Sequence, residues 1–124
     1  MSETIAQKLA AYGIDYMDAM DRMDDNAELY KKLALKYLND QNYANLVAAL
    51  EVKDFDGAYK AAHALKGVSG NLSFTDLFKA AASASDALFQ GEYQAAEGFL
   101  PIISAANDKV ITGLTAWEDG TLEA

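Results

Sequence analysis

Several residue types that carry much of protein chemistry are scarce in this chain, which has no cysteine, one proline and one histidine in 124 residues. The absence of cysteine excludes disulfides, thiolate metal sites and thiol catalysis, and one histidine cannot assemble the usual zinc sites. No apolar run approaches the roughly 18 to 20 residues that span a bilayer. The acidic start Met-Ser-Glu-Thr also lacks the features of a signal peptide. We therefore expect a cytoplasmic protein that owes its stability to packing.

Basic residues are also few, because 10 lysines and arginines stand against 19 acidic residues, for a net charge of −9. Nucleic acids and anionic membranes attract clustered basic residues, so we expect neither as a partner. The hydrophobic fraction of 52% is typical of a folded soluble protein. A chain of this length suits one core, and we expect a monomer with a single domain over residues 1–124.

Apolar residues recur at intervals of three and four along nearly the whole chain, and runs of β-branched residues are missing. This pattern predicts an all-α protein. Brief connections between the longer segments favour an antiparallel four-helix bundle. We expect short N-terminal helices over residues 3–23, the bundle over residues 27–118, and a frayed tail over residues 119–124.

Capping residues predict where the first helices begin and end. Ser2 can cap a helix that runs to about Tyr12 and ends at Gly13. Asp15 can start a second short helix. The polar cluster of residues 24–26 then predicts a stop followed by a new cap.

The later helices follow the same logic. The amphipathic stretch 29–50 is expected to bend or break near residues 39–42, and Asp54 is expected to cap a helix over residues 55–71. Ser73 with Asp76 resembles a capping box that opens a helix over residues 74–90, closed by Gly91. Pro101 either kinks one long last helix or lies in the first turn of a new one.

The only histidine lies in the run Ala62-His-Ala-Leu-Lys-Gly-Val-Ser-Gly-Asn-Leu72. Its two glycines each cost about 1 kcal/mol in a helix interior, so close approach of another backbone or of a partner must offset that cost. Helical geometry places His63 about 110 to 120° from the middle of the core-facing stripe. The stripe comprises Phe55, Ala58, Tyr59, Ala62, Leu65, Ser69 and Leu72. His63 should therefore reach solvent, with Lys66 and Gly67 one turn away.

An exposed histidine ring can act as a nucleophile without a separate base, because an imidazole in water has a pKa of about 6.5. Phosphorus is a suitable electrophile for it. Lys66 can offset charge on phosphoryl oxygens, since phosphoryl transfer depends chiefly on positioning and electrostatics. Gly67 leaves room for a partner's active site. The candidate site is thus His63, Lys66 and Gly67, and the role of Gly70 stays open between helix packing and partner approach.

The run also resembles the signature His-x-Leu-Lys-Gly-x-Ser-x-Asn-Leu-Gly of histidine-containing phosphotransfer domains. Seven positions match, namely His63, Leu65, Lys66, Gly67, Ser69, Asn71 and Leu72. The resemblance covers about residues 27–117. It departs at Ser73, where the family commonly has glycine, and at Ser85, where several members carry a glutamine near the histidine.

The resemblance implies a phosphoryl carrier of two-component phosphorelays rather than an independent kinase or phosphatase. His63 would accept the phosphoryl group from a receiver-domain phospho-aspartate and pass it to another receiver aspartate. Lys66 would assist, Gly67 would keep the approach clear, and Ser69 and Leu72 would support packing. Partners would be response-regulator receiver domains or a hybrid sensor kinase. The chain would hold no cofactor or metal, because Mg²⁺ would belong to the receiver.

Two alternatives remain open from the sequence. The chain could be a non-phosphorylated helical module that docks receivers, although the intact His63 and Lys66 argue against this. It could also be a phosphotransfer domain excised from a hybrid sensor kinase, although Met1 favours a free-standing protein. The acidic residues between positions 15 and 25 are better explained by capping and solvation than by cation binding, since a calcium-loop motif is absent.

Overall fold

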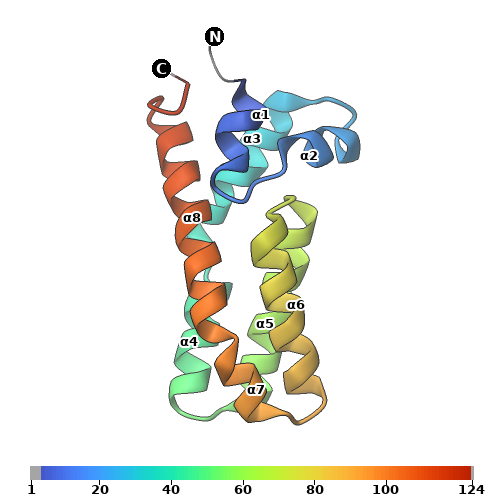
Figure 1. The fold of residues 1–124 in the computed structure, drawn as a ribbon, viewed down its shortest axis with the longest axis vertical. Helices are drawn as coiled ribbons and strands as arrows, with labels where there is room; N and C mark the ends of the chain where they lie inside the picture. The colour runs from blue at the N-terminus through green and yellow to red at the C-terminus, as the bar shows by residue number, and fades with distance from the viewer. Residues whose placement is uncertain (1–3, 124) are drawn as a thin grey trace.

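The computed structural model describes residues 4–123, which form helices and no strand (Figure 1). Among these residues, no helix has both the length and the apolar character that a membrane crossing requires. The elements are α1 (Ile5–Ala10), α2 (Tyr16–Arg22), α3 (Ala27–Lys36), the 3₁₀ turn η1 (Tyr37–Asn39), α4 (Asn42–Glu51), α5 (Phe55–Asn71), α6 (Thr75–Phe89), α7 (Tyr93–Gly98) and α8 (Leu100–Glu118).

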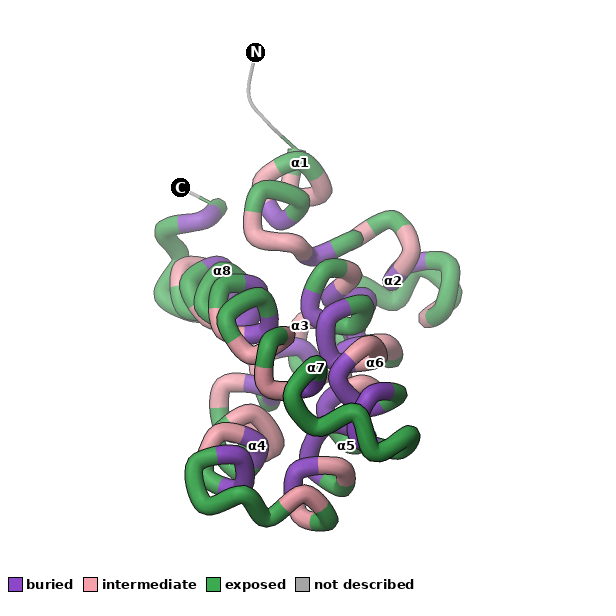
Figure 2. The backbone as a smooth tube through the Cα atoms, turned by 60° about the horizontal axis from the view of Figure 1, so that its bottom comes forward, coloured by how far each residue is buried: buried purple, intermediate pink, exposed green. Residues whose placement is uncertain are grey.

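Four helical segments run alternately up and down and form the predicted antiparallel bundle (Figure 1). The first combines α3, η1 and α4, and the others are α5, α6 and α8. The short helix α7 crosses between α6 and α8 at one end, while α1 and α2 lie at the other. The buried sides of the segments face one another in the interior (Figure 2), so the prediction of an all-α bundle is confirmed.

Helix α5 has the bounds that its sequence predicts. The side chain of Asp54 accepts a hydrogen bond of 3.0 Å from the Gly57 amide, which fixes the first turn. Ala58, Ala62 and Leu65 of the predicted stripe are fully buried. The helix packs against both α4 and α6, so its backbone is held from two sides.

The chain breaks where the sequence predicts breaks. Asp40 is extended, and its carboxylate accepts a 2.8 Å hydrogen bond from the Asn42 amide at the start of α4. Pro101 lies in the first turn of α8 rather than at a kink, because α7 has already ended at Gly98. Gly91 has a φ of +77°, the left-handed conformation expected after a helix.

The predicted N-cap of α6 at Ser73 is wrong. The helix begins at Thr75, its N-cap residue is Phe74, and no side chain caps it. Ser73 instead has a φ of +60°, and its hydroxyl donates to Asp18 in α2 at 2.8 Å. The Thr75 amide donates to the Gly13 carbonyl instead. The Gly13 carbonyl thus provides a hydrogen-bond acceptor at the start of α6, the role that was expected of the Ser73 side chain.

Both ends of the described chain also differ from expectation. Thr4 caps α1 through a capping box with Gln7, whereas Ser2, the expected cap, lies outside the described residues. The predicted frayed tail is wrong for residues 119–123. Leu122 is buried and its amide donates to the Ala116 carbonyl, while Glu123 pairs with Lys31 at 3.0 Å. Burial of the apolar Leu122 side chain stabilises this turn.

The N-terminal helices are joined to the bundle by backbone and side-chain contacts. An isolated bridge pairs Ile14 with Phe74, and the Asp15 amide donates to the Ser73 carbonyl at 2.8 Å. The buried Tyr30 hydroxyl donates to the Leu72 carbonyl at 2.6 Å. These contacts place α2 beside the corner between α5 and α6.

Candidate functional site

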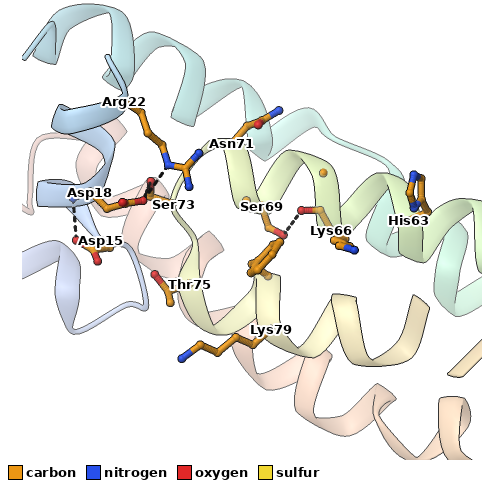
Figure 3. Close-up of a pocket in the computed structure, with 13 residues that line it drawn as sticks. Asp15, Asp18, Arg22, His63, Lys66, Ser69, Asn71, Ser73, Thr75 and Lys79 are labelled. Atoms are coloured by element: carbon orange, nitrogen blue, oxygen red, sulfur yellow. Dashed lines mark hydrogen bonds and ion pairs between the residues drawn. The ribbon is translucent and has the colours of Figure 1, made fainter. Parts of the chain in front are cut away.

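His63 lies on the outer face of α5, and its predicted exposure is confirmed. The helix on which it lies is held by α4 and α6, so the ring projects from a rigid support into solvent. Lys66, one turn further on, is partly buried. The three predicted site residues His63, Lys66 and Gly67 all border one groove (Figure 3).

The groove has a volume of about 550 Å³. One wall is α5, a second is the start of α6, and α2 closes the end away from His63 (Figure 3). Its lining comprises Asp15, Asp18, Arg22, His63, Lys66, Gly67, Ser69, Gly70, Asn71, Ser73, Thr75, Phe78 and Lys79. The site is therefore open at the histidine and bounded by three helices.

The two site glycines differ in their surroundings. Apart from its two chain neighbours and the adjacent backbone of its own helix, a Cβ atom built on Gly67 would meet no atom of residues 4–123 within 4 Å. A Cβ built on Gly70 would lie 2.9 Å from a ring carbon of Phe78 on α6. Gly70 therefore serves helix packing, which answers the question that the sequence left open. Packing gives no reason for a glycine at position 67.

Three cationic side chains, Arg22, Lys66 and Lys79, line the groove. Arg22 donates to the Asp18 carboxylate at 2.9 Å, and its hydrogen bond, followed by that of Ser73, lowers the pKa of Asp18 below its usual range. Within the described part of the chain, neither Lys66 nor Lys79 forms an ion pair. Their ammonium groups are thus available to an incoming anion.

Two further signature residues, Ser69 and Leu72, and the non-signature residue Ser85 have structural environments. The Ser69 hydroxyl donates to the Leu65 carbonyl at 2.6 Å inside α5, and Leu72 is buried. Ser85, at the position where the resemblance places the glutamine of several family members, is buried and does not line the groove. It therefore offers the groove no polar group.

Some residues near the site were not assigned a role by the sequence. Lys79 and Arg22 reach the groove from α6 and α2, and no spacing within α5 could have indicated them. Tyr59 was placed on the core stripe, yet its ring stacks on His63 with centroids 5.7 Å apart. The spacing of four residues from Tyr59 to His63 was the available signal.

Comparison with known protein families decides the identity. The family model for the Hpt domain matches residues 38–117. The chain is an Hpt domain. No curated protein and no solved structure was found to match it. The match includes α4 to α8 and the whole of the signature run, whereas α1 to α3 precede it. The Hpt domain thus has its histidine on α5, and part of its groove lies on helices outside the match.

Proposed function

We propose that this Hpt domain is a phosphorelay carrier that accepts a phosphoryl group on His63 from a receiver phospho-aspartate and passes it to a second receiver aspartate. The observation that carries the proposal is the exposed ring of His63 on a helix packed between two others, beside a groove whose two lysines form no ion pair within residues 4–123. Family membership supports the reaction type. The partners are response-regulator receiver domains or the receiver of a hybrid kinase.

The transfer is a displacement at phosphorus. The lone pair of a neutral imidazole nitrogen forms the N–P bond while the P–O bond of the acyl phosphate breaks, and the aspartate carboxylate leaves with that electron pair. The second ring nitrogen either keeps its proton or releases it to water. The return step reverses these bonds at another aspartate. The N–P bond on His63 therefore stores the phosphoryl group between the two transfers.

The residues around His63 supply electrostatics and access. The Lys66 ammonium offsets charge on the phosphoryl oxygens as they approach the ring, and Lys79 adds positive potential from the opposite wall of the groove. Mg²⁺ and the acidic residues that hold it would come from the receiver. The carrier then needs only a positioned nucleophile and a clear approach, which fits a chain with one histidine.

The direct test is incubation with a panel of phosphorylated receiver domains and Mg²⁺. We expect mass spectrometry to find an acid-labile, base-stable phosphate on His63 and loss of phosphate from the receiver. Phosphoramidate, a small donor that needs no docking, serves as a control for the reactivity of the ring. Labelling by phosphoramidate but by no receiver across a broad panel would contradict the carrier function and favour a docking module.

Gly67→Ala is expected to separate stability from function. The new methyl group would meet open space, so the variant should gain about 1 kcal/mol of unfolding free energy from helix propensity. The same methyl would lie where a receiver must approach, so transfer should slow about tenfold through misplacement of the reacting atoms. Urea denaturation and receiver-dependent labelling measure the two effects.

Gly70→Ala is the matched control for that variant. Its methyl group would contact the Phe78 ring, which must move, so we expect no gain in stability. If both alanine variants were equally stabilised, or if Gly67→Ala transferred at the wild-type rate, the function assigned to Gly67 would be wrong.

A further inference from the structure

The ring of Tyr59 lies against the ring of the histidine. Tyr59 precedes His63 by four residues on α5, their centroids are 5.7 Å apart, and the angle between ring planes is 27°. This geometry is a stacked aromatic contact. The imidazole therefore has one face against a neighbour and the rest of its surface toward solvent and the groove.

Tyr59 is itself held from the neighbouring helix. It is partly buried against the core, and its ring also contacts Phe89 of α6 with centroids 5.9 Å apart. Phe89 is 76% exposed, so core packing does not account for this large apolar side chain. The histidine ring thus contacts Tyr59 on α5, and through Tyr59 it is connected to Phe89 on α6.

No other side-chain interaction fixes the ring of His63. Within residues 4–123 it takes part in no side-chain hydrogen bond and no ion pair. An exposed helical histidine without restraint samples several staggered rotamers, of which only some direct a ring nitrogen at a partner. In-line attack at phosphorus needs that direction to be held.

We propose that Tyr59 is a positioning residue for the phosphotransfer reaction, acting by stacking to hold His63 in the rotamer that presents its nitrogen to the incoming phosphorus. This inference rests on the proposed function of His63. The ring of Tyr59, and not its hydroxyl, restrains His63, because no hydrogen bond of the Tyr59 hydroxyl occurs in the described part of the chain. Phenylalanine should therefore substitute for Tyr59.

The experiment compares Tyr59→Ala with Tyr59→Phe. At saturating phosphorylated receiver, Tyr59→Ala is expected to lower the maximal transfer rate about two- to tenfold, the range of one lost aromatic contact. The receiver concentration at half-maximal rate should change less than about twofold, and Tyr59→Phe should restore the rate. The inference would be overturned if Tyr59→Ala changed only the receiver concentration at half-maximal rate and not the maximal rate. It would also be overturned if Tyr59→Phe failed to restore transfer.

Phe55→Ala is the matched control. Phe55 is also a partly buried aromatic residue of α5, and its ring stacks on that of Tyr93 with centroids 4.0 Å apart, but it is two turns from His63. We expect this variant to transfer at the wild-type maximal rate. Equal slowing by Phe55→Ala and Tyr59→Ala would point to general loss of packing and would overturn a specific role for Tyr59.

A spectroscopic measurement keeps this inference separate from the proposed function. In NMR spectra of the unphosphorylated protein, the ring protons of His63 should carry a ring-current shift in the wild type and in Tyr59→Phe, and lose it in Tyr59→Ala. Identical shifts in all three proteins would overturn the stacking itself. If no receiver labels the wild type but the shift is lost in Tyr59→Ala, the carrier function fails while the contact stands.

Discussion

Replacing His63 with glutamine is expected to abolish phosphoryl labelling by every donor while leaving the fold intact. Glutamine is polar and of similar length but has no ring nitrogen to attack phosphorus. The side chain at this position is exposed, so the unfolding free energy should change by about 0.5 kcal/mol or less. Receiver-dependent and phosphoramidate-dependent labelling measure the first effect, and urea denaturation measures the second.

The two halves of this prediction can fail separately. Label retained in His63→Gln would place the phosphoryl group on another residue. A stability loss of several kcal/mol would instead mean that the histidine supports the core, contrary to its position on the outer face of α5. Lys66→Ala is a useful companion, because it should slow labelling without abolishing it.

The second large effect expected is alkaline unfolding. Burial, with a smaller contribution from Asp15, raises the pKa of Tyr30 well above its usual value of 10.0. Burial raises the pKa of Tyr37 in the same way, with Asp40 adding to it. Both phenols are protonated donors in the fold, to the Leu72 carbonyl and to the Asn107 side chain. The folded chain therefore resists an ionisation that the unfolded chain undergoes freely.

The sign of the effect follows from proton linkage. A group whose pKa is raised by folding contributes its full stability below the unfolded pKa and loses it as the pH rises toward the folded value. Above pH 10, each such tyrosine should lower the unfolding free energy by about 1.4 kcal/mol per pH unit. Two of them remove about 5 kcal/mol between pH 10 and pH 12, a large part of the stability of an ordinary domain.

Urea denaturation at pH 8, 10, 11 and 12 measures this slope. Tyr37→Phe cannot ionise at that position, so its stability should fall about half as steeply with pH as that of the wild type. Tyr30→Phe should behave alike, although it starts less stable at pH 8 because the Leu72 carbonyl loses its buried donor. A flat profile from pH 10 to pH 12 would show that these phenols ionise in the fold.

Much of the fold was accessible from sequence because its determinants are local. The bounds of α5 follow from an aspartate cap and from apolar periodicity, which act within a few residues. The position of His63 on the outer face follows from helical geometry alone. The break near residue 40 and the left-handed conformation of Gly91 likewise depend on residues that are close in the sequence.

The errors occurred where a distant segment decides the local structure. Serine is a common N-cap residue, but the Ser73 hydroxyl donates its hydrogen bond to Asp18, 55 positions away. Leu122 lies two positions after Gly120 in a polar tail, and no apolar periodicity predicts its burial against the bundle. The groove wall supplied by Arg22 could not be predicted either, since nothing in α5 or α6 encodes where α2 packs.

The attachment of the N-terminal helices bears on how the protein can be divided. The family match begins at residue 38, yet the Leu72 carbonyl at the end of α5 depends on Tyr30, and Phe74 pairs with Ile14. Trp117 of α8, which lies inside the match, packs against Tyr30, which lies outside it. A fragment cut at the edges of the family match would expose these partners together. The unit that must be expressed to obtain a folded protein is therefore longer than the unit that carries the family signature.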